Sequence, residues 1–165
     1  MPSFVTATVT EVLSQRPGLA RVATDAGRAY ALVDLTGPVA VGDRVVLNTT
    51  AVELGLGTGG WHVVHWNLAR DAWSRPGPGH IVKLRYTSLQ HDAGAAEEDH
   101  PDLPASLPGT PVVACSLHSQ VAVVAAVVRH LRPAARIAYV MTDGAALPLA
   151  LSDLVHGLRE RGVLD

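Results

Sequence analysis

The stretch SFVTATVTEVLSQRPGLARVATDAGRAYALVDL, residues 3–35, decides the fold of this chain. Residues 3–15 alternate threonine with valine and alanine, which is typical of a half-buried β-strand. A Pro-Gly pair then predicts a turn into a second strand at residues 19–24. The short segment Asp-Ala-Gly that follows predicts a hairpin turn into a third strand at residues 28–35.

Two further strands are expected before residue 70. A Val-Gly-Asp turn leads into Arg-Val-Val-Leu-Asn at residues 44–48, and residues 61–67 form a further run rich in tryptophan, valine and histidine. Several short strands at such close spacing favour a small closed barrel of the OB or SH3-like kind. We therefore predict a β-barrel domain over residues 1–70.

The pattern changes after the barrel. Residues 71–110 are interpreted as a linker that holds one strand, at 80–89, and an acidic loop rich in proline and alanine. Residues 111–165 then alternate between short apolar runs and helical spacing. We interpret this last part as a small α/β unit.

Strands are predicted at residues 112–115 and 136–141, and helices at residues 118–131 and 148–161. Two strands joined by a helix must run parallel with a right-handed connection, so this unit is a βαβα arrangement and the whole chain is predicted to be α+β. Two parallel strands do not make a stable open sheet alone. The unit is therefore incomplete unless the strand at 80–89, a partner chain or further polypeptide joins it.

The composition limits the class of protein. Hydrophobic residues make up 48% of the 165 and charged residues 17%, so the chain can bury a core and should be globular. The net charge of -2 leaves no basic excess for phosphates, which argues against nucleic acid as a partner. The longest apolar stretch, residues 121–128, is too short to span a bilayer, and the N-terminus lacks a signal-peptide pattern, so no membrane association is expected.

Cys115 is the only cysteine, which excludes an intramolecular disulfide and a thiolate metal cluster within one chain. A reducing, cytoplasmic location is expected. His62 and His65 lie three residues apart on a predicted strand and therefore face opposite sides, so no metal site is predicted.

A glycine-rich loop, Gly-Leu-Gly-Thr-Gly-Gly at residues 55–60, matches the spacing of a dinucleotide-binding loop. A strand follows it, where a dinucleotide site needs a helix, so a flexible loop between barrel strands is favoured. One functional alternative stays open: the backbone N–H groups around Thr58, Gly59 and Gly60 could line an anion site or an entrance.

Lys83 and Arg85 share one face of the strand predicted at 80–89. Two cations there could hold a phosphate or a carboxylate. They could equally be solvated charges at a sheet edge, and that alternative is favoured because paired surface charges are ordinary.

The C-terminal unit carries the sharpest group of candidate residues. The first predicted strand leads into Ser116, His118 and Ser119, and the second leads into Asp143 and Gly144. Ligands bind beyond the carboxyl ends of the strands in open α/β sheets, so these side chains could form a ligand site. The structural alternative is equally weighted: Ser119 would be a helix cap, and the Asp-Gly pair only a turn.

Four segments together resemble a known family: Gly57–Gly60 with the strand that follows, Gly79–Tyr86, Leu117–Gln120 and Tyr139–Pro148. The combination is similar to an uncharacterised bacterial family, domain of unknown function 3866, and the similarity covers most of the chain. The resemblance implies no activity, so it assigns no catalytic residue. The composition, rich in alanine, valine, arginine and glycine, also suits a bacterial source.

Three hypotheses for the function follow. The first is a small-molecule or anion-binding α/β protein, whose status as an enzyme is open, with its site at the carboxyl ends of the parallel strands. The second is a barrel-type binding module for nucleic acid or protein. The third is an interaction or structural module whose sheet is completed by a partner subunit, as in a homo-oligomer. No pattern in the sequence indicates a cofactor, a substrate or a reaction.

Overall fold

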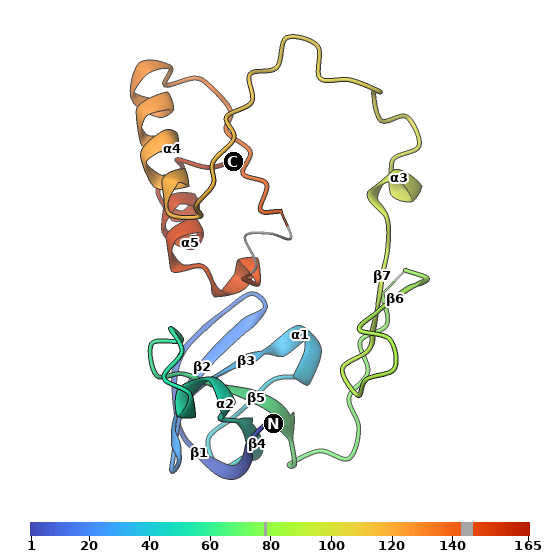
Figure 1. Cartoon of the computed structure of the whole chain (residues 1–165), viewed down its shortest axis with the longest axis vertical. Helices are drawn as coiled ribbons and strands as arrows, with labels where there is room; N and C mark the ends of the chain where they lie inside the picture. The colour runs from blue at the N-terminus through green and yellow to red at the C-terminus, as the bar shows by residue number, and fades with distance from the viewer. Residues whose placement is uncertain (78, 143–146) are drawn as a thin grey trace. The chain divides into compact units, whose positions relative to one another are not determined.

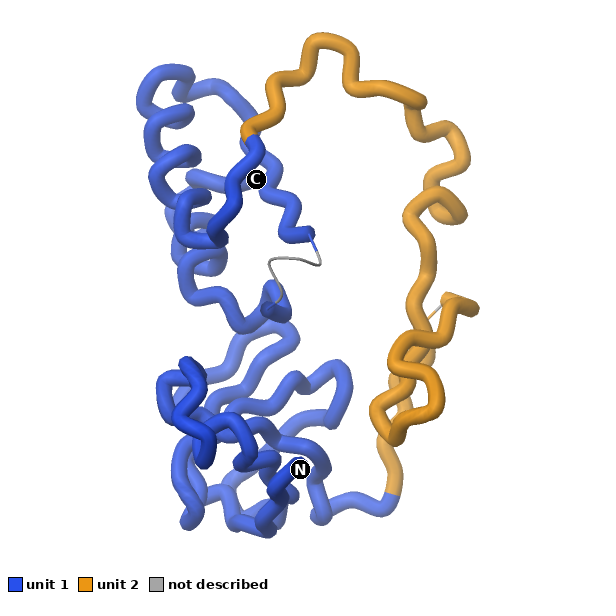
Figure 2. The backbone as a smooth tube through the Cα atoms, in the orientation of Figure 1, with its two compact units in different colours: residues 1–71, 114–165 blue, residues 72–113 orange. Residues whose placement is uncertain are grey.

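A computed structural model describes residues 1–77, 79–142 and 147–165 and divides the chain into two units (Figure 2). The first unit consists of residues 1–71 together with residues 114–165. The second consists of residues 72–113.

Five strands form a closed barrel at the start of the first unit (Figure 1). They are β1 (Phe4–Arg16), β2 (Leu19–Thr24), β3 (Gly27–Leu32), β4 (Arg44–Asn48) and β5 (His62–Asn67). The order around the barrel is β1-β2-β3-β5-β4, with β3 and β5 parallel and the other pairs antiparallel. This strand order is that of OB-type barrels. The predicted N-terminal barrel and the α+β class are thus confirmed.

Alternation along the strands puts the barrel core on one side of each strand. Val9, Val22, Val45, Leu47 and Val64 are all 2% exposed or less. The long strand β1 pairs with β4 in its first half and with β2 in its second half, and two register shifts mark the change. Such bulges bend a strand, which allows a single long strand to close a small barrel.

A buried asparagine fixes one end of the barrel. Asn67 is fully buried, and its amide nitrogen donates to the Pro38 carbonyl and, at 2.7 Å, to the Asp43 carboxylate. Asp43 also accepts from the Ala40 backbone N–H at 2.9 Å. These bonds hold the loop between α1 (Val33–Thr36) and β4 against the end of β5.

The helices of the C-terminal part pack on each other. They are α4 (Gln120–Leu131), the 3-10 turn η2 (Leu149–Leu151) and α5 (Asp153–Glu160), and a short α2 (Thr50–Glu53) lies between β4 and β5. A small core joins the helices: its buried residues are Val121, Ala125, Val155, Leu158 and Leu164. The helices predicted at 118–131 and 148–161 are therefore present with shorter bounds.

The strands predicted at residues 112–115 and 136–141 are not formed in the described part of the chain. The parallel pair of the structure is instead β3 with β5, inside the barrel. Residues 138–142 make no backbone hydrogen bond to another described residue. A strand requires a ladder of hydrogen bonds to a neighbouring backbone, and for these two segments the described residues supply only one such bond, from the Asp165 N–H to the Ile137 carbonyl at 3.1 Å.

The second unit holds a short hairpin and one helical turn: β6 (Ile81–Lys83), β7 (His91–Ala93) and α3 (Ala96–Asp99). The strand predicted at 80–89 is thus shorter than expected. Leu84 and Tyr86 have positive φ angles, which side chains disfavour, so the extended conformation ends directly after Lys83. Over both units, none of the described helices combines the length and the apolar character that crossing a membrane requires.

The barrel core yields a direct stability prediction. Replacing Leu47, which is fully buried, with alanine should lower the unfolding free energy by about 2–5 kcal/mol, because a cavity replaces packed atoms. Leu54→Ala is the matched control, since Leu54 is 67% exposed. Urea unfolding followed by circular dichroism measures both. Equal losses for the two variants would show that Leu47 is not a core residue.

Candidate functional site

The outer face of β2 and β3 carries a pair of arginines and a tyrosine. Alternation turns Val22 and Ala29 into the barrel, which leaves Arg21, Arg28 and Tyr30 on the outside. Arg21 lies directly opposite Tyr30 in the antiparallel register of the two strands. Partial burial raises the pKa of the Tyr30 hydroxyl, because its ionised form would lose hydration.

Both arginines lie over the ring of Trp61. The guanidinium carbon of Arg28 is 4.7 Å from the ring centroid, and that of Arg21 is 5.4 Å away. Arg28 also donates from Nη2 to the Gly59 carbonyl at 3.1 Å. Cations within about 6 Å of an indole ring are attracted to it. The Trp61 ring and the Gly59 carbonyl thus hold the Arg28 guanidinium in place. Arg28 forms no ion pair with any described residue, so no carboxylate offsets its charge.

The predicted glycine-loop residues lie beside this stack. Gly59 and Gly60 both have positive φ angles, and a Cβ at Gly60 would lie 3.7 Å from Arg28 Nη2. The loop contacts Arg28 through the Gly59 carbonyl oxygen rather than through an N–H group. Thr58 Oγ1 is buried without a hydrogen-bond partner among the described residues. The structure therefore brings the loop candidates to the arginine and tryptophan cluster.

Hydrogen bonds hold α2, the helical turn that precedes the same loop. Thr49 donates from its hydroxyl to the Glu53 carboxylate, and Ser3 donates from its backbone N–H to Thr50 Oγ1 at 2.8 Å. The Thr49 bond, with a further one from the Ser3 side chain, holds the pKa of Glu53 below its ordinary value. The charge of Glu53 is thus engaged within α2 and its surroundings.

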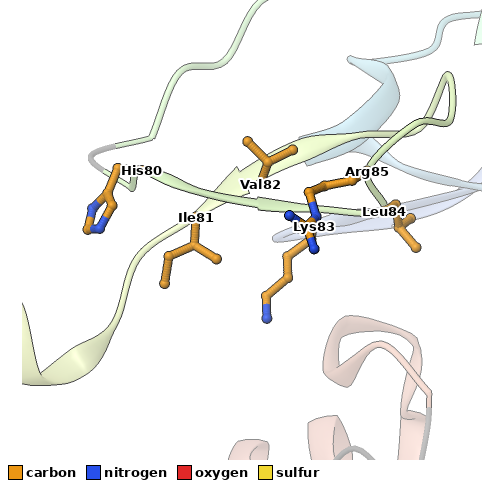
Figure 3. Close-up of a pocket in the computed structure, with 6 residues that line it drawn as sticks. All are labelled: His80, Ile81, Val82, Lys83, Leu84 and Arg85. Atoms are coloured by element: carbon orange, nitrogen blue, oxygen red, sulfur yellow. The ribbon is translucent and has the colours of Figure 1, made fainter.

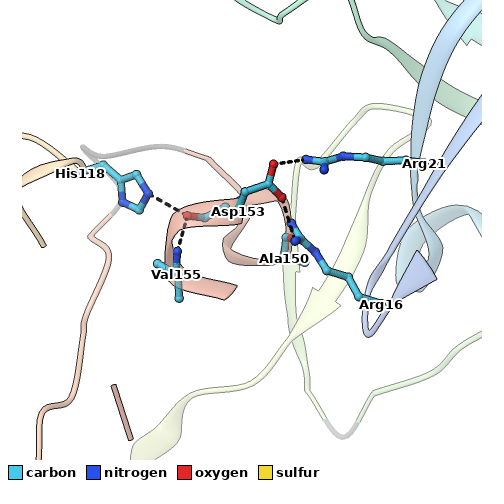
Figure 4. Close-up of polar contacts among 7 residues, drawn as sticks. Arg16, Arg21, His118, Ala150, Asp153 and Val155 are labelled. Atoms are coloured by element: carbon cyan, nitrogen blue, oxygen red, sulfur yellow. Dashed lines mark hydrogen bonds and ion pairs between the residues drawn. The ribbon is translucent and has the colours of Figure 1, made fainter. Parts of the chain in front are cut away.

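The start of α5 lies against the same part of the barrel through Asp153 (Figure 4). One carboxylate oxygen is 2.8 Å from Arg16 Nη1, and the other is 2.9 Å from Arg21 Nη2. Arg16 also donates from Nε to the Ala150 carbonyl at 2.9 Å. The hydrogen bond from Arg21, followed by that from Arg16, holds the pKa of Asp153 below its usual range.

One nitrogen of Arg16 remains without a partner. Its Nη2 atom is buried and has no hydrogen bond to a described residue. The Arg16 side chain as a whole is 15% exposed. A buried N–H group without an acceptor is unfavourable, and solvent does not reach Arg16 Nη2 in this conformation.

His118, a predicted site residue, is held between two hydroxyls. Its Nδ1 is 2.8 Å from Tyr139 Oη. Its Nε2 is 2.8 Å from Ser152 Oγ, the contact drawn as a dashed line from His118 in Figure 4. Ser152 Oγ also accepts from the Val155 backbone N–H at 3.1 Å, as an N-cap residue does. Either tautomer of the imidazole satisfies both neighbours, because each hydroxyl can donate or accept.

This arrangement orients the start of α5. An imidazole beside a hydroxyl is the geometry of a base and a nucleophile, but Ser152 is only 4% exposed and its oxygen also caps the helix. His118 therefore serves here to fasten three segments together. It fixes the direction in which α5, and with it Asp153, begins.

The other C-terminal candidates are placed differently. Ser116 is exposed. Ser119 precedes α4 without capping it through its side chain, and Gln120 accepts from the Leu117 N–H at 3.0 Å instead. Asp143 and Gly144 lie outside the described residues. Among the described members of this group, His118 is the one that contacts the candidate site, through Ser152.

Lys83 and Arg85 line an open hollow of about 660 Å³ in the second unit (Figure 3). Its other lining residues are His80, Ile81, Val82 and Leu84. His80 is 3.4 Å from the Glu98 carboxylate. All six lining side chains are exposed, so the hollow encloses little, and the interpretation of solvated charges at a hairpin still fits best.

Sequence reasoning missed most of the residues that meet at this site: Arg16, Arg21, Arg28, Trp61, Tyr139, Ser152 and Asp153. Alternation along the predicted hairpin could have placed Arg21 and Arg28 on the outer face. No local signal could have paired them with Trp61 or Asp153, which are distant in sequence.

Residues 28–165 match the model of a family described as "Protein of unknown function (DUF3866)". This match covers more than half of the chain and confirms the resemblance seen in the sequence. No curated protein and no solved structure matches the chain.

The pairing of Asp153 predicts a pH dependence at α5. The ordinary pKa of the carboxyl is 3.8, and the folded value is lower, so the stabilisation is fully present above about pH 4 and is lost as the pH falls through the folded value. At pH 7, Asp153→Asn should speed amide exchange at Val155 and Leu158 about two- to fivefold, the range expected for exposed pairs. The difference from wild type should shrink as the pH falls below 3.8, because the carboxylate is progressively protonated.

A double-mutant cycle with Arg21→Gln separates the ion pair from the effect of the charge on the helix dipole. The double variant should exchange little faster than either single variant. Fully additive effects of the two substitutions would show that the pair contributes nothing.

Proposed function

The chain belongs to the DUF3866 family, and on the geometry of its barrel face we propose that it binds a small oxyanion-bearing ligand, of the phosphate class, at Arg21, Arg28 and Trp61. The description of the family names no activity. The proposal therefore rests on the arrangement of side chains alone.

One observation carries the proposal: Arg28 is held in place without a carboxylate partner. Its guanidinium is positioned by the Trp61 ring and by the Gly59 carbonyl, and only one of its five N–H groups is used in the latter bond. A guanidinium that is already ordered loses little freedom when it binds, and its planar fork matches phosphate oxygens. Arg21 supplies a second guanidinium over the same ring.

The cationic face covers only a small part of the barrel, and the rest of the barrel is not basic. This limits the size of an anionic ligand. Residues 1–71 hold five arginines against six acidic residues: Arg16, Arg21, Arg28, Arg44 and Arg70 against Glu11, Asp25, Asp34, Asp43, Glu53 and Asp71. A long polyanion needs a basic surface along its length. The balance of charge favours a small ligand and argues against nucleic acid.

The C-terminal candidates keep a role in this proposal. His118 orients the start of α5, which carries Asp153 onto Arg16 and Arg21. His118 is a positioning residue in this scheme. No reaction is proposed for this site.

A second candidate function, self-association through strand pairing, is favoured by the segment at 136–141. Ile137, Tyr139 and Met141 are half-buried there, while Ala138 and Val140 are exposed, which is strand alternation without a strand partner. Val140 is 77% exposed, and the backbone of residues 138–142 pairs with no described residue. We infer that the same segment of a second copy pairs along this edge, as in a homo-oligomer.

A cytoplasmic location is proposed on the single cysteine. Cys115 is free and exposed, and an exposed thiol without a partner is best preserved in a reducing compartment. A bacterial source is proposed from the composition alone, which is rich in alanine, valine, arginine and glycine.

Titration with inorganic pyrophosphate at low ionic strength, followed by calorimetry, tests the binding proposal. Arg28→Ala should weaken binding about tenfold or more, since a hydrogen bond to a charged group contributes roughly 1.5–3 kcal/mol. Trp61→Ala should also weaken it, because Arg28 loses the ring that orients it. Arg44→Ala is the matched control, an exposed arginine on β4, and should change affinity less than twofold.

Titration with two further ligands tests which class of molecule the site binds. Tighter binding of citrate than of pyrophosphate would replace phosphate by carboxylate as the preferred oxyanion. Binding of a thymidine oligonucleotide with a steep salt dependence, together with no pyrophosphate binding, would refute the small-ligand proposal.

Light scattering at about 50 μM tests self-association, since contacts of this kind are commonly populated at micromolar concentration. Wild type should be a dimer and Ala138→Pro a monomer, because proline removes the N–H that pairing needs and suits an extended chain. Unchanged circular dichroism shows that the variant is folded. A wild-type chain that stays strictly monomeric disproves strand pairing between copies.

A further inference from the structure

We propose that Asp153 is an internal substitute for the ligand: its carboxylate occupies the oxyanion position between Arg16 and Arg21, and a bound phosphate that takes this position releases α5 from the barrel. This inference rests on the proposed function and adds its regulation. The ligand and the helix would then compete for one pair of guanidiniums.

The geometry of the carboxylate is that of a bound oxyanion. Each of its two oxygens takes a different arginine, at 2.8 and 2.9 Å (Figure 4). A phosphate offers the same pair of oxygens and more negative charge, so it can replace the carboxylate on the same donors. Arg16 Nη2, buried and without a partner among the described residues, is a donor that the carboxylate leaves unused.

The contact that would be broken is polar and small. The barrel core and the helical core are two separate clusters with no residue in common. Among the described residues, the polar contacts that join α5 and the preceding turn η2 to the barrel are the two ion pairs of Asp153 and the hydrogen bond from Arg16 to the Ala150 carbonyl. The Asp153 side chain is 62% exposed, and exposed ion pairs are weak, so a small ligand can compete with them.

The residues on either side of Asp153 are nonetheless held by contacts of their own. A Cβ at Gly18, which has a φ of 78°, would lie 3.2 Å from the Ala150 Cβ, so the turn between β1 and β2 closely approaches the residue three before Asp153. On its other side, Ser152 is bound by His118 and caps α5. The carboxylate is therefore presented to the arginines by structure on both sides.

Arg21 connects this contact with the proposed ligand face. It pairs with Asp153 and lies over Trp61, next to Arg28. A ligand that spans Arg21 and Arg28 must therefore compete with Asp153 for Arg21. By linkage, the fraction of molecules in which Asp153 is released sets the apparent affinity, so a contact closed ten times more often than open weakens binding about tenfold.

The test compares Asp153→Asn with Glu160→Gln by pyrophosphate titration of the full chain. Both variants remove one negative charge from α5, but Glu160 is exposed and lies at the far end of the helix. Asp153→Asn should bind pyrophosphate about three- to tenfold more tightly than wild type, as the competition predicts. Glu160→Gln should bind like wild type.

Amide exchange gives a second readout that does not depend on the variants. In wild type, saturating pyrophosphate should speed exchange at Val155 and Leu158, because α5 loses its attachment to the barrel. In Asp153→Asn, exchange should already be fast and should change little on addition of pyrophosphate. Amides of Val22 and Leu47 in the barrel core report that the barrel itself stays folded.

The two proposals fail in different ways. If pyrophosphate binds and Arg28→Ala weakens it, but Asp153→Asn binds no more tightly than wild type and α5 exchange is unchanged, the competition is refuted and the ligand site stands. If Arg28→Ala leaves the affinity unchanged, or if pyrophosphate does not bind, the ligand site is refuted and the competition falls with it.

Discussion

The parallel pairing of β3 with β5 closes the barrel, and the candidate site depends on its register. Ala29 pairs with His62 and Tyr30 with Val63. Continued by one residue, that register sets Arg28 beside Trp61, and alternation turns both away from the core. The stack of guanidinium on indole is therefore a consequence of how the barrel closes. A register one residue different would separate the two side chains.

The chain is held together by two kinds of contact with different strengths. Within the barrel, fully buried valines and leucines pack, and Asn67 makes buried hydrogen bonds. The helical part has its own small core, formed by α4 and α5. Between the two, the contacts at the start of α5 are hydrogen bonds and ion pairs with partly exposed groups. Such contacts can exchange one oxyanion for another at little free-energy change, which packed apolar side chains cannot do.

Patterns in the sequence predicted the strands and helices whose formation depends on neighbouring residues in the chain. The alternation in residues 3–35 predicted the first three strands, and the three- and four-residue spacing after His118 predicted α4. The apolar run at 136–141 has the alternation of a strand, yet a strand also needs a neighbouring backbone, which the sequence of one segment does not specify. Two of the residues singled out from the sequence, His118 and Gly59, contact members of the candidate site, but their partners do not follow from local sequence. Arg21 meets a residue 132 positions away in Asp153, and only the closed barrel brings that about.

The net charge of the chain conceals this local arrangement, because the acidic side chains of the barrel are used elsewhere. Asp25 accepts from the Thr8 backbone N–H, Asp43 accepts from Asn67, and Glu53 accepts from Thr49. Each carboxylate thus stabilises a turn or a short helix near its own position. The described acidic partner of Arg16, at the end of β1, and of Arg21, on the outer face of β2, comes from α5 instead. Charges interact over a distance of about 10 Å at moderate salt, so a ligand responds to the three arginines nearby rather than to the sum over the chain. A nearly neutral chain can therefore present a cationic face, and the carboxylate that offsets this face belongs to a helix that can move away from it.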